Sequence, residues 1–227
     1  MKTIRLKYPY VAVMKDRTLS YGGNQSWFQG KILKKYGCGV IAGTDVLLYL
    51  SLHKEYCRGM EFKEEKDING IWEEEQYQDA VKTMRRRYFP VIPGFGMPGW
   101  VLAAGMNAYF RKNRIPLKVS FGVLGRNIWN RTAAMLAHDI PVILAVGPNR
   151  SLFRRKHKLN FYVKNGEEYI CACQTAAHFV TVTAMEEQYL KISSWGKEYF
   201  INIQEYMDYV KKYSSYFVSN VFYIRKR

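Results

Sequence analysis

The order of hydrophobic and polar positions predicts that the first half of the chain is mostly helical. Residues 39–52 carry apolar side chains on nearly every face, which is typical of a buried helix. Residues 61–88 are charged with a helical pattern, and residues 100–112 are amphipathic. Residues 126–139 form another helical pattern that ends just before Pro141, as expected ahead of a proline.

Alternating positions predict that the second half is mostly antiparallel strand. Residues 159–174 read as two strands around an Asn-Gly turn. Further strands are predicted at 8–14, 116–125, 141–147, 178–185, 189–195 and 198–203, with a short helix near 204–213. This segregation predicts an α+β fold in one domain over residues 1–227, with a helical half at about 20–139 and a β half at about 140–227 that includes the N-terminal strand.

Composition places the chain among globular proteins. Apolar residues make up 48% of its 227 residues, which argues against a disordered chain. No run approaches the roughly 18 apolar residues of a membrane helix, and the N-terminus lacks the apolar stretch of a secretion signal. The four cysteines, at 38, 57, 171 and 173, fit no disulfide framework, so we expect reduced thiols and a cytoplasmic location.

The balance of charge is strongly basic. The chain has 35 Lys and Arg against 19 Asp and Glu, a net charge of +16, with basic clusters at 84–89, 111–114, 149–158 and the C-terminus. Such a field favours anionic partners, including nucleic acid, anionic lipid and wall polymers. A solvated basic surface explains the same clusters, and the sequence contains no recognisable nucleic-acid-binding motif.

Candidate chemistry begins at Cys38, which stands between Gly37 and Gly39 at the start of the apolar helix. The free N–H groups and the positive end of the helix dipole favour a thiolate at this position. Flanking glycines allow a substrate carbonyl to approach backbone donors. These features indicate an activated nucleophile that still lacks a base.

His178 is the best candidate for that base. It opens a predicted strand, and the next strand along the chain is expected to bring Ser193 or Ser194 near its imidazole. The other histidines, at 53, 138 and 157, are assigned no role. Cys171 and Cys173 share one face of a predicted strand, which is typical of two core cysteines; with His178 they also suggest a metal site, but a zinc site usually needs four ligands and no second pair is present.

A cysteine that opens a buried helix, a histidine that opens a strand, and a following strand that ends in Ser-Trp-Gly together resemble the papain-like cysteine peptidase superfamily. The closest resemblance is to its bacterial branch, the bacteriocin leader-peptide-processing peptidases. It covers roughly residues 20–60 and 130–212 and does not extend to residues 61–130. The resemblance implies a papain-like fold, with Cys38 at the start of the buried helix of the helical half.

Site roles follow from the resemblance, residue by residue. Cys38 would be the nucleophile and His178 the general base. The third position, Asn or Asp in the family, falls on Ser193, a neutral and shorter side chain that orients the imidazole less firmly. The glutamine that binds the oxyanion, about six residues before the cysteine in the family, would be Gln25 in preference to Gln29, which implies a small insertion between Gln25 and Cys38. No cofactor or metal is implied.

The function expected from these residues is acyl transfer. A cysteine peptidase and a related acyltransferase share this machinery, so the sequence leaves open whether an amide or a thioester of a peptide or protein substrate is attacked. A second hypothesis is a papain-like scaffold with weak catalysis that acts as a binding protein. A third is a basic module that binds nucleic acid or another polyanion, with the thiol incidental.

Overall fold

The structure is a computed structural model that describes residues 3–57, 71–147 and 157–227. Its helices are α1 (Lys31–Tyr36), α2 (Cys38–His53), α3 (Glu74–Arg87), α4 (Gly99–Lys112), α5 (Ile128–Ala137) and α6 (Ile203–Tyr213). Its strands are β1 (Ile4–Arg5), β2 (Ala12–Lys15), β3 (Thr18–Leu19), β4 (Ile71–Glu73), β5 (Leu117–Phe121), β6 (Val142–Val146), β7 (Leu159–Asn165), β8 (Glu168–Thr175), β9 (His178–Glu186), β10 (Tyr189–Ser194), β11 (Lys197–Asn202) and β12 (Phe222–Lys226). The expected mixture of helices and antiparallel strands is therefore present.

The largest sheet has seven strands and is antiparallel throughout. Its order is β1-β9-β10-β11-β7-β8, and β6 also pairs with β9. β6 pairs with the first part of β9, from His178 to Val182, whereas β1 pairs with its last part. β9 is therefore held along both edges, which fixes the position of His178 at its start.

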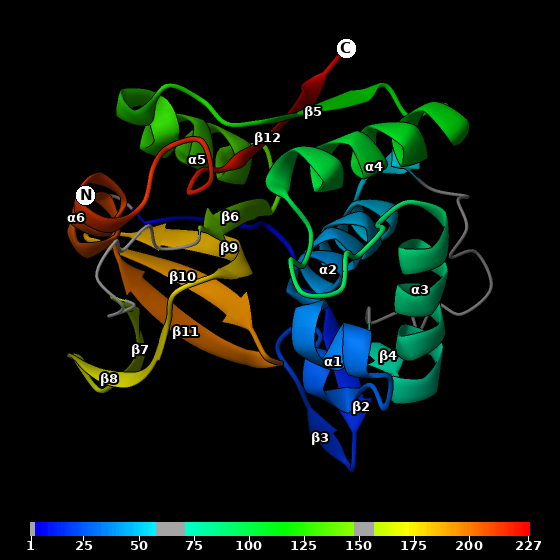
Figure 1. Cartoon of the computed structure of the whole chain (residues 1–227), viewed down its shortest axis with the longest axis horizontal. Coiled ribbons are helices and arrows are strands. Elements are labelled where there is room, and N and C mark those ends of the chain that lie inside the picture. Colours follow the sequence, from blue (N-terminus) through cyan, green and yellow to red (C-terminus); the bar gives the residue numbers. More distant parts are fainter. Residues whose placement is uncertain (1–2, 58–70, 148–156) are drawn as a thin grey trace.

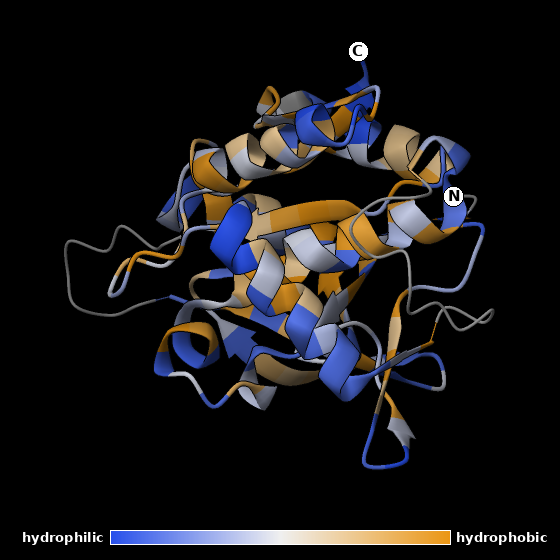
Figure 2. Cartoon of the chain, turned by 90° about the vertical axis from the view of Figure 1, so that its right-hand side faces the viewer, coloured by the Kyte–Doolittle hydropathy of each residue, from blue (hydrophilic) through white to orange (hydrophobic). Residues whose placement is uncertain are grey.

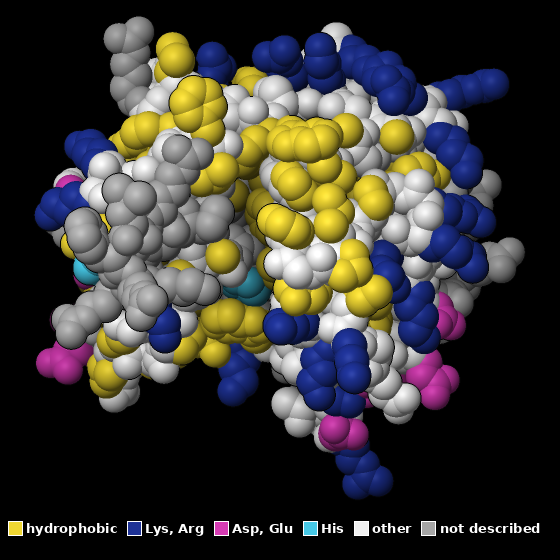
Figure 3. All heavy atoms as spheres, in the orientation of Figure 1, with side chains coloured by type: hydrophobic (Ala, Val, Ile, Leu, Met, Phe, Trp, Pro, Cys, Tyr) yellow, Lys and Arg dark blue, Asp and Glu magenta, His cyan; other side chains and the backbone are white. Residues whose placement is uncertain are grey.

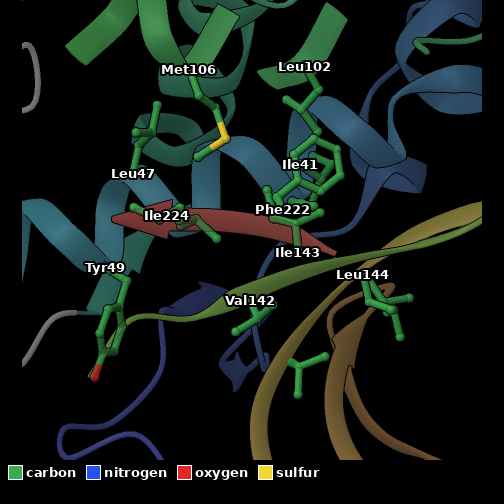
Figure 4. Packing of buried hydrophobic residues seen from close by; sticks show 14 of the residues in the cluster. Ile41, Leu47, Tyr49, Leu102, Met106, Val142, Ile143, Leu144, Phe222 and Ile224 are labelled. Atoms are coloured by element: carbon green, nitrogen blue, oxygen red, sulfur yellow. The ribbon is translucent and has the colours of Figure 1, made fainter. Parts of the chain in front are cut away.

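Helix α2 lies against this sheet and forms the centre of the molecule (Figure 1). Thirteen of its sixteen residues are buried, because it is covered by β9 and β6 on one side and by α3 and α4 on others. Figure 4 shows Ile41 and Leu47 of α2 packed among Met106 of α4, Ile143 of β6 and Phe222 of β12. The prediction of an apolar, buried helix at 39–52 is confirmed, and it begins one residue earlier, at Cys38.

The surrounding helices are amphipathic and turn polar residues outward. In Figure 2, α3 faces the viewer and presents a hydrophilic surface, while hydrophobic residues lie toward the interior. Its capping box joins Glu73 and Gln76, which accounts for the helix beginning at Glu74. The helical pattern predicted for 61–88 is therefore present from Glu74 on, and its first part, 61–70, lies outside the described residues.

One prediction about strands is wrong, and one strand was not predicted. The segment 8–14 is not one strand of the main sheet: β1 alone joins that sheet, and β2 pairs with β3 and β4 in a separate sheet of three. The intervening Pro9 has no backbone N–H to donate, so a continuous ladder is broken there. The C-terminal strand β12 was not predicted; it returns to the helical side and pairs with β5. In the part of the chain that the structure describes, no helix has the length and apolar character that a bilayer span requires.

Candidate active site

The two glycines beside Cys38 are explained by close packing. A Cβ on Gly37 would lie 2.3 Å from the carbonyl oxygen of Leu33, because Gly37 ends α1 and also precedes α2. A Cβ on Gly39 would lie 2.7 Å from Met97 and 3.1 Å from Phe179. The start of α2 is thus pressed against α1, against the loop before α4 and against β9. A side chain at position 37 would overlap the backbone of α1, and one at position 39 would require Met97 to move.

His178 is buried at the start of β9, with 8% of its surface exposed. Its Nε2 lies 2.8 Å from the Oγ of Ser194 on β10. The indole of Trp195 stacks on the imidazole, with ring centroids 4.4 Å apart and planes at 20°. One ring nitrogen is therefore engaged by a hydroxyl and one ring face is covered, so the orientation of the imidazole is fixed and Nδ1 is left for other contacts.

Ser193, which the resemblance places third, does not contact the imidazole. Its Oγ donates a hydrogen bond of 2.7 Å to the carbonyl oxygen of Tyr21. The hydrogen bond to His178 comes from the next residue, Ser194. Ser193 also borders the cavity that contains His178. The hydrogen bond expected of Ser193 involves Ser194 in this structure, so the geometry does not support the assignment of the third position to Ser193.

Gln25 lies in a short 3₁₀ turn, and its side chain borders the same cavity as Cys38. Its Nε2 donates to the carbonyl oxygen of Lys34 at 2.9 Å, and its Oε1 is buried with no hydrogen-bond partner among the described residues. An amide nitrogen carries two protons, so one remains after the bond to Lys34. Gln29 is exposed and does not border the cavity. The extra residues between Gln25 and Cys38 form α1.

Asp45 is a member of the site that the sequence pattern did not reveal. It lies seven residues after Cys38, on the same face of α2, and only 1% of its surface is exposed. Its Oδ1 accepts a hydrogen bond of 2.5 Å from the hydroxyl of Tyr77, and its Oδ2 accepts one of 3.0 Å from the N–H of Gly23. A single carboxyl group thereby joins α2, α3 and the loop that carries Gln25.

The segment just before Gln25, the glycine loop of residues 21–24, is closely packed against its surroundings. A Cβ on Gly23 would lie 1.7 Å from the hydroxyl of Tyr77, and one on Gly22 would lie 2.2 Å from Ser193 Oγ. Asn24 Nδ2 donates to the carbonyl oxygen of Trp195 at 2.9 Å, and the N–H of Gly196 donates to the carbonyl oxygen of Gly23 at 2.9 Å. The glycine loop is therefore attached to the turn that follows Ser194.

A narrow cavity connects these residues. Cys38, His178, Gln25, Asp45 and Ser194 all border it. Its water-accessible volume is about 10 Å³, close to what one water molecule requires. Because Trp195 also borders the cavity while stacked on His178, a substrate has to displace this side chain or enter beside it.

Burial sets the protonation of the Cys38–His178 pair. Burial raises the pKa of the Cys38 thiol above its ordinary value, and the backbone N–H groups of Phe179, Gly39 and Cys38 oppose this only in part. Burial also lowers the pKa of His178 to about 3. The sequence predicts a thiolate from the helix terminus alone, but desolvation outweighs that effect. Both shifts favour the neutral thiol and the neutral imidazole on the wall of the cavity that the two residues share.

Burial acts on Asp45 in the same sense. It raises the pKa of this carboxyl group to about 6, although the hydrogen bonds from Tyr77, Gly23 and Tyr10 favour the charged form. At neutral pH the site therefore holds a buried carboxylate, which is costly unless it is hydrogen-bonded.

The remaining cysteines lie away from this cavity. Cys57 is buried, whereas Cys171 is exposed and Cys173 half-buried on the edge strand β8. The interpretation of the pair at 171 and 173 as core cysteines is therefore wrong for Cys171, whereas Cys173 packs against the core while half-buried. Over residues 3–57, 71–147 and 157–227, no three His, Cys, Asp or Glu side chains group as metal ligands would.

Comparisons with known proteins add no relative: no family model matches the chain, and no curated protein matches it. The inference of function therefore depends on the chemistry of the cavity itself.

Proposed function

We propose that the protein is a papain-like cysteine peptidase or a related acyltransferase, similar to the bacteriocin leader-peptide-processing peptidases, that attacks an amide or thioester carbonyl through Cys38. One observation carries the proposal: a thiol at the first residue of a buried helix and an imidazole at the first residue of the adjacent strand border the same cavity. The bond between His178 and Ser194 supports it, because a base that acts on a nucleophile is commonly oriented by a third group.

The proposed reaction starts from the neutral pair. As Cys38 Sγ attacks the carbonyl carbon, the thiol proton passes to His178, which then donates it to the departing amine or thiol. The resulting thioester on Cys38 is cleaved by water, or by another acceptor, with His178 taking the proton of the attacking group. The N–H of Cys38 and the free proton of Gln25 Nε2 stabilise the oxyanion.

The electrostatics of the cavity favour this order of events. Because burial raises the pKa of Cys38 and lowers that of His178, a preformed ion pair is disfavoured and proton transfer accompanies attack. Ser194 holds the imidazole through a neutral hydroxyl, so it stabilises the imidazolium less than a carboxylate would. We therefore expect Cys38 to be acylated at a measurable but low rate.

The test is acylation of Cys38 by a small activated ester, followed by mass spectrometry of the intact protein and of its peptides. We expect an acyl adduct on Cys38, no adduct on the buried Cys57, and a rate at least about 100-fold lower in His178→Ala. Cys57 serves as an internal control because burial raises its pKa too, to about 12, and it does not border the cavity that contains His178. Equal labelling of the two thiols, or no effect of His178→Ala, would refute the proposal.

A binding scaffold with the same fold is the second candidate. The neutral partner of His178, the raised pKa of Cys38 and the narrow cavity favour it. It predicts that Cys38 forms no acyl adduct even after Trp195→Ala has opened the cavity. An adduct that appears only in Trp195→Ala would instead indicate an enzyme whose site is closed at rest.

A further inference from the structure

A second concave surface lies on the helical side of the molecule. It is a groove of about 720 Å³ between the last turns of α4, the strand β5 and the C-terminal strand β12. Five exposed cations border it: Arg111, Lys118, Arg225, Lys226 and Arg227. No Asp or Glu side chain borders it, and none of the five forms an ion pair within the described residues. This surface is called the basic groove below.

The strand register brings two of these cations face to face. Lys118 of β5 lies directly opposite Arg225 of β12, and both are exposed. Their neighbours Val119 and Ile224, also opposite each other, turn into the core. Like charges directly opposite in a sheet repel and destabilise it. The fold maintains this repulsion on the outer face, and a bound anion would relieve it.

The shape of the basic groove is fixed before any ligand arrives. Asn107 of α4 borders it and joins the helix to β5, because its Nδ2 donates to the carbonyl oxygen of Val119 at 2.7 Å and its Oδ1 accepts from the N–H of Val119 at 2.9 Å. Preformed surfaces lose less free energy to ordering on binding. The groove is therefore built to hold a ligand rather than to collapse around one.

Helix α4 runs from the neighbourhood of Gly39 to the basic groove. Just before its start, Met97 packs against Gly39, the residue after Cys38. At its end, Arg111 borders the groove. The helix has fourteen residues, a length of about 21 Å. Trp100, with 69% of its surface exposed, and Ala104 and Arg111 lie on one outer face of the helix. Figure 3 shows hydrophobic side chains over the start of α4 and Lys and Arg side chains along the rim above.

We propose that the basic groove binds an acidic segment of the peptide or protein substrate, at a distance along the substrate from the bond held at Cys38. This rests on the proposed function, because it names the substrate class of that site. Arginine forks pair with carboxylates through two parallel hydrogen bonds, and three of the five cations are arginines. The exposed Trp100 lies between the two positions and provides an apolar contact for the intervening chain.

The composition of the groove favours a peptide over nucleic acid. Proteins that hold single strands combine cations with aromatic side chains on which bases stack. The residues that border the basic groove are cationic, an asparagine and an alanine, with no aromatic ring among them. A carboxylate-rich segment needs cations and hydrogen-bond donors alone, which is what the groove presents.

The test is fluorescence anisotropy with a labelled glutamate-rich peptide, using the full chain. We expect saturable binding that weakens several-fold as NaCl rises from about 0.05 M to about 0.3 M. The double variant Arg111→Glu/Lys118→Glu should weaken binding about tenfold or more. Lys164→Glu, an exposed lysine of β7 in the sheet half, makes the same kind of charge change outside the groove and should weaken it less than twofold.

The folding of the variants provides an independent readout. Lys118→Glu places an acidic side chain opposite Arg225, so it should stabilise the β5–β12 pair while it weakens binding. No saturable binding, equal binding by Arg111→Glu/Lys118→Glu, or tighter groove-dependent binding of a single-stranded oligonucleotide or of phosphatidylserine vesicles would each overturn the proposal.

The experiments distinguish a failure of peptide binding at the basic groove from a failure of the proposed enzymatic function. Cys38→Ser should leave peptide binding unchanged, and the groove variants should leave the acylation of Cys38 by a small ester unchanged. If Cys38 is acylated but the peptide does not bind, the proposed enzymatic function is supported and the proposed docking surface is refuted. If the peptide binds but Cys38 is not acylated, the docking surface is supported and the enzymatic function is refuted.

Discussion

The imidazole of His178 is held by Ser194, not by Ser193, through a contact of 2.8 Å between Nε2 and Oγ. Ser193 turns the other way and donates to the carbonyl oxygen of Tyr21. Two adjacent serines thus have different roles, one at the proposed base and one at the glycine loop. This division can be tested by removing each hydroxyl in turn.

We expect Ser194→Ala to lower the rate of Cys38 acylation about tenfold, because the imidazole loses its partner but remains present as a base. Ser194→Thr keeps a hydroxyl at this position and should restore most of the rate. Ser193→Ala should leave the rate within about twofold and cost about 1 kcal/mol of stability in urea unfolding, since it removes one hydrogen bond. The opposite ranking of the two alanine variants would contradict the geometry.

The protonation of Cys38 predicts an unusual pH profile for alkylation. Burial raises the pKa of the thiol, so the rate constant for iodoacetamide should rise through a midpoint above about 8.5, the value of a free cysteine. Because the pKa of His178 is lowered to about 3, no second inflection should appear between about pH 4 and pH 7. A plateau already reached below about pH 7 would instead indicate a thiolate–imidazolium pair.

Asp45 should make the folded state less stable as pH rises. Its pKa of about 6 in the folded protein lies above the ordinary value of 3.8, so the protonated form is the one that folding favours. The stability that comes from a protonated Asp45 is fully present below about pH 4 and is lost as pH rises through about 6. The free energy of unfolding should therefore be lower by about 3 kcal/mol at pH 8.

Asp45→Asn removes that dependence. Its amide oxygen still accepts from the N–H of Gly23, so we expect the variant to be about 1–3 kcal/mol more stable than the native protein at pH 8 and no more stable at pH 4. Urea unfolding at the two pH values measures the difference. A variant that is equally destabilised at both would show that the carboxylate is favourable in the fold.

The close fit of the glycine loop predicts a strong and specific steric effect. Gly23→Ala should cost more than about 2 kcal/mol, because its Cβ would overlap the hydroxyl of Tyr77. Removing only that hydroxyl in Gly23→Ala/Tyr77→Phe should recover little of the loss, because the Cβ would still lie 2.3 Å from Cζ of the ring. Gly30→Ala is the matched control: its Cβ meets nothing within 4 Å, so its cost should stay below about 0.5 kcal/mol. Equal costs for the two glycines would contradict the packing.

Much of the fold is predictable because its periodicities are strong. The all-apolar stretch after Cys38 is α2, the Asn-Gly turn joins β7 and β8, and the helix predicted for 126–139 ends before Pro141. The meeting of Cys38 and His178 in one cavity also follows from their places at element starts. Apolar residues on all faces of a helix and alternation along a strand are patterns within a short stretch of sequence, and the corresponding elements are present in the structure.

The choice between Ser193 and Ser194 is not predictable from such signals. Alternation along β10 is clear, but the register against β9 shifts between Lys191 and Ile192. A bulge of one residue exchanges the two faces of a strand beyond it. Which serine faces the imidazole is therefore decided by a pairing detail that leaves no trace in the hydrophobic pattern.

Asp45 and β12 were missed for different reasons. Asp45 is a single carboxylate in a helix that is otherwise apolar on nearly every face, so the hydrophobic pattern gives it no role. Its position seven residues after Cys38 places it on the same face of the helix, which could have indicated that it belongs to the site. The strand β12 follows a helix and pairs with β5, about a hundred residues earlier, so its partner is remote in sequence. Long-range pairings of this kind are not encoded in a local window.

The glycine loop is secured by three segments that are far apart along the chain: Asp45 from α2, Tyr77 from α3 and the turn after Ser194. The hydrogen bond from Asn24 to Trp195 spans 171 residues of the chain, so the surroundings of the glycine loop are complete only once the chain has been made as far as that turn. If Cys38 is the nucleophile that we propose, its partners at the cavity are therefore assembled late, and a partly made chain would carry Cys38 as an ordinary cysteine.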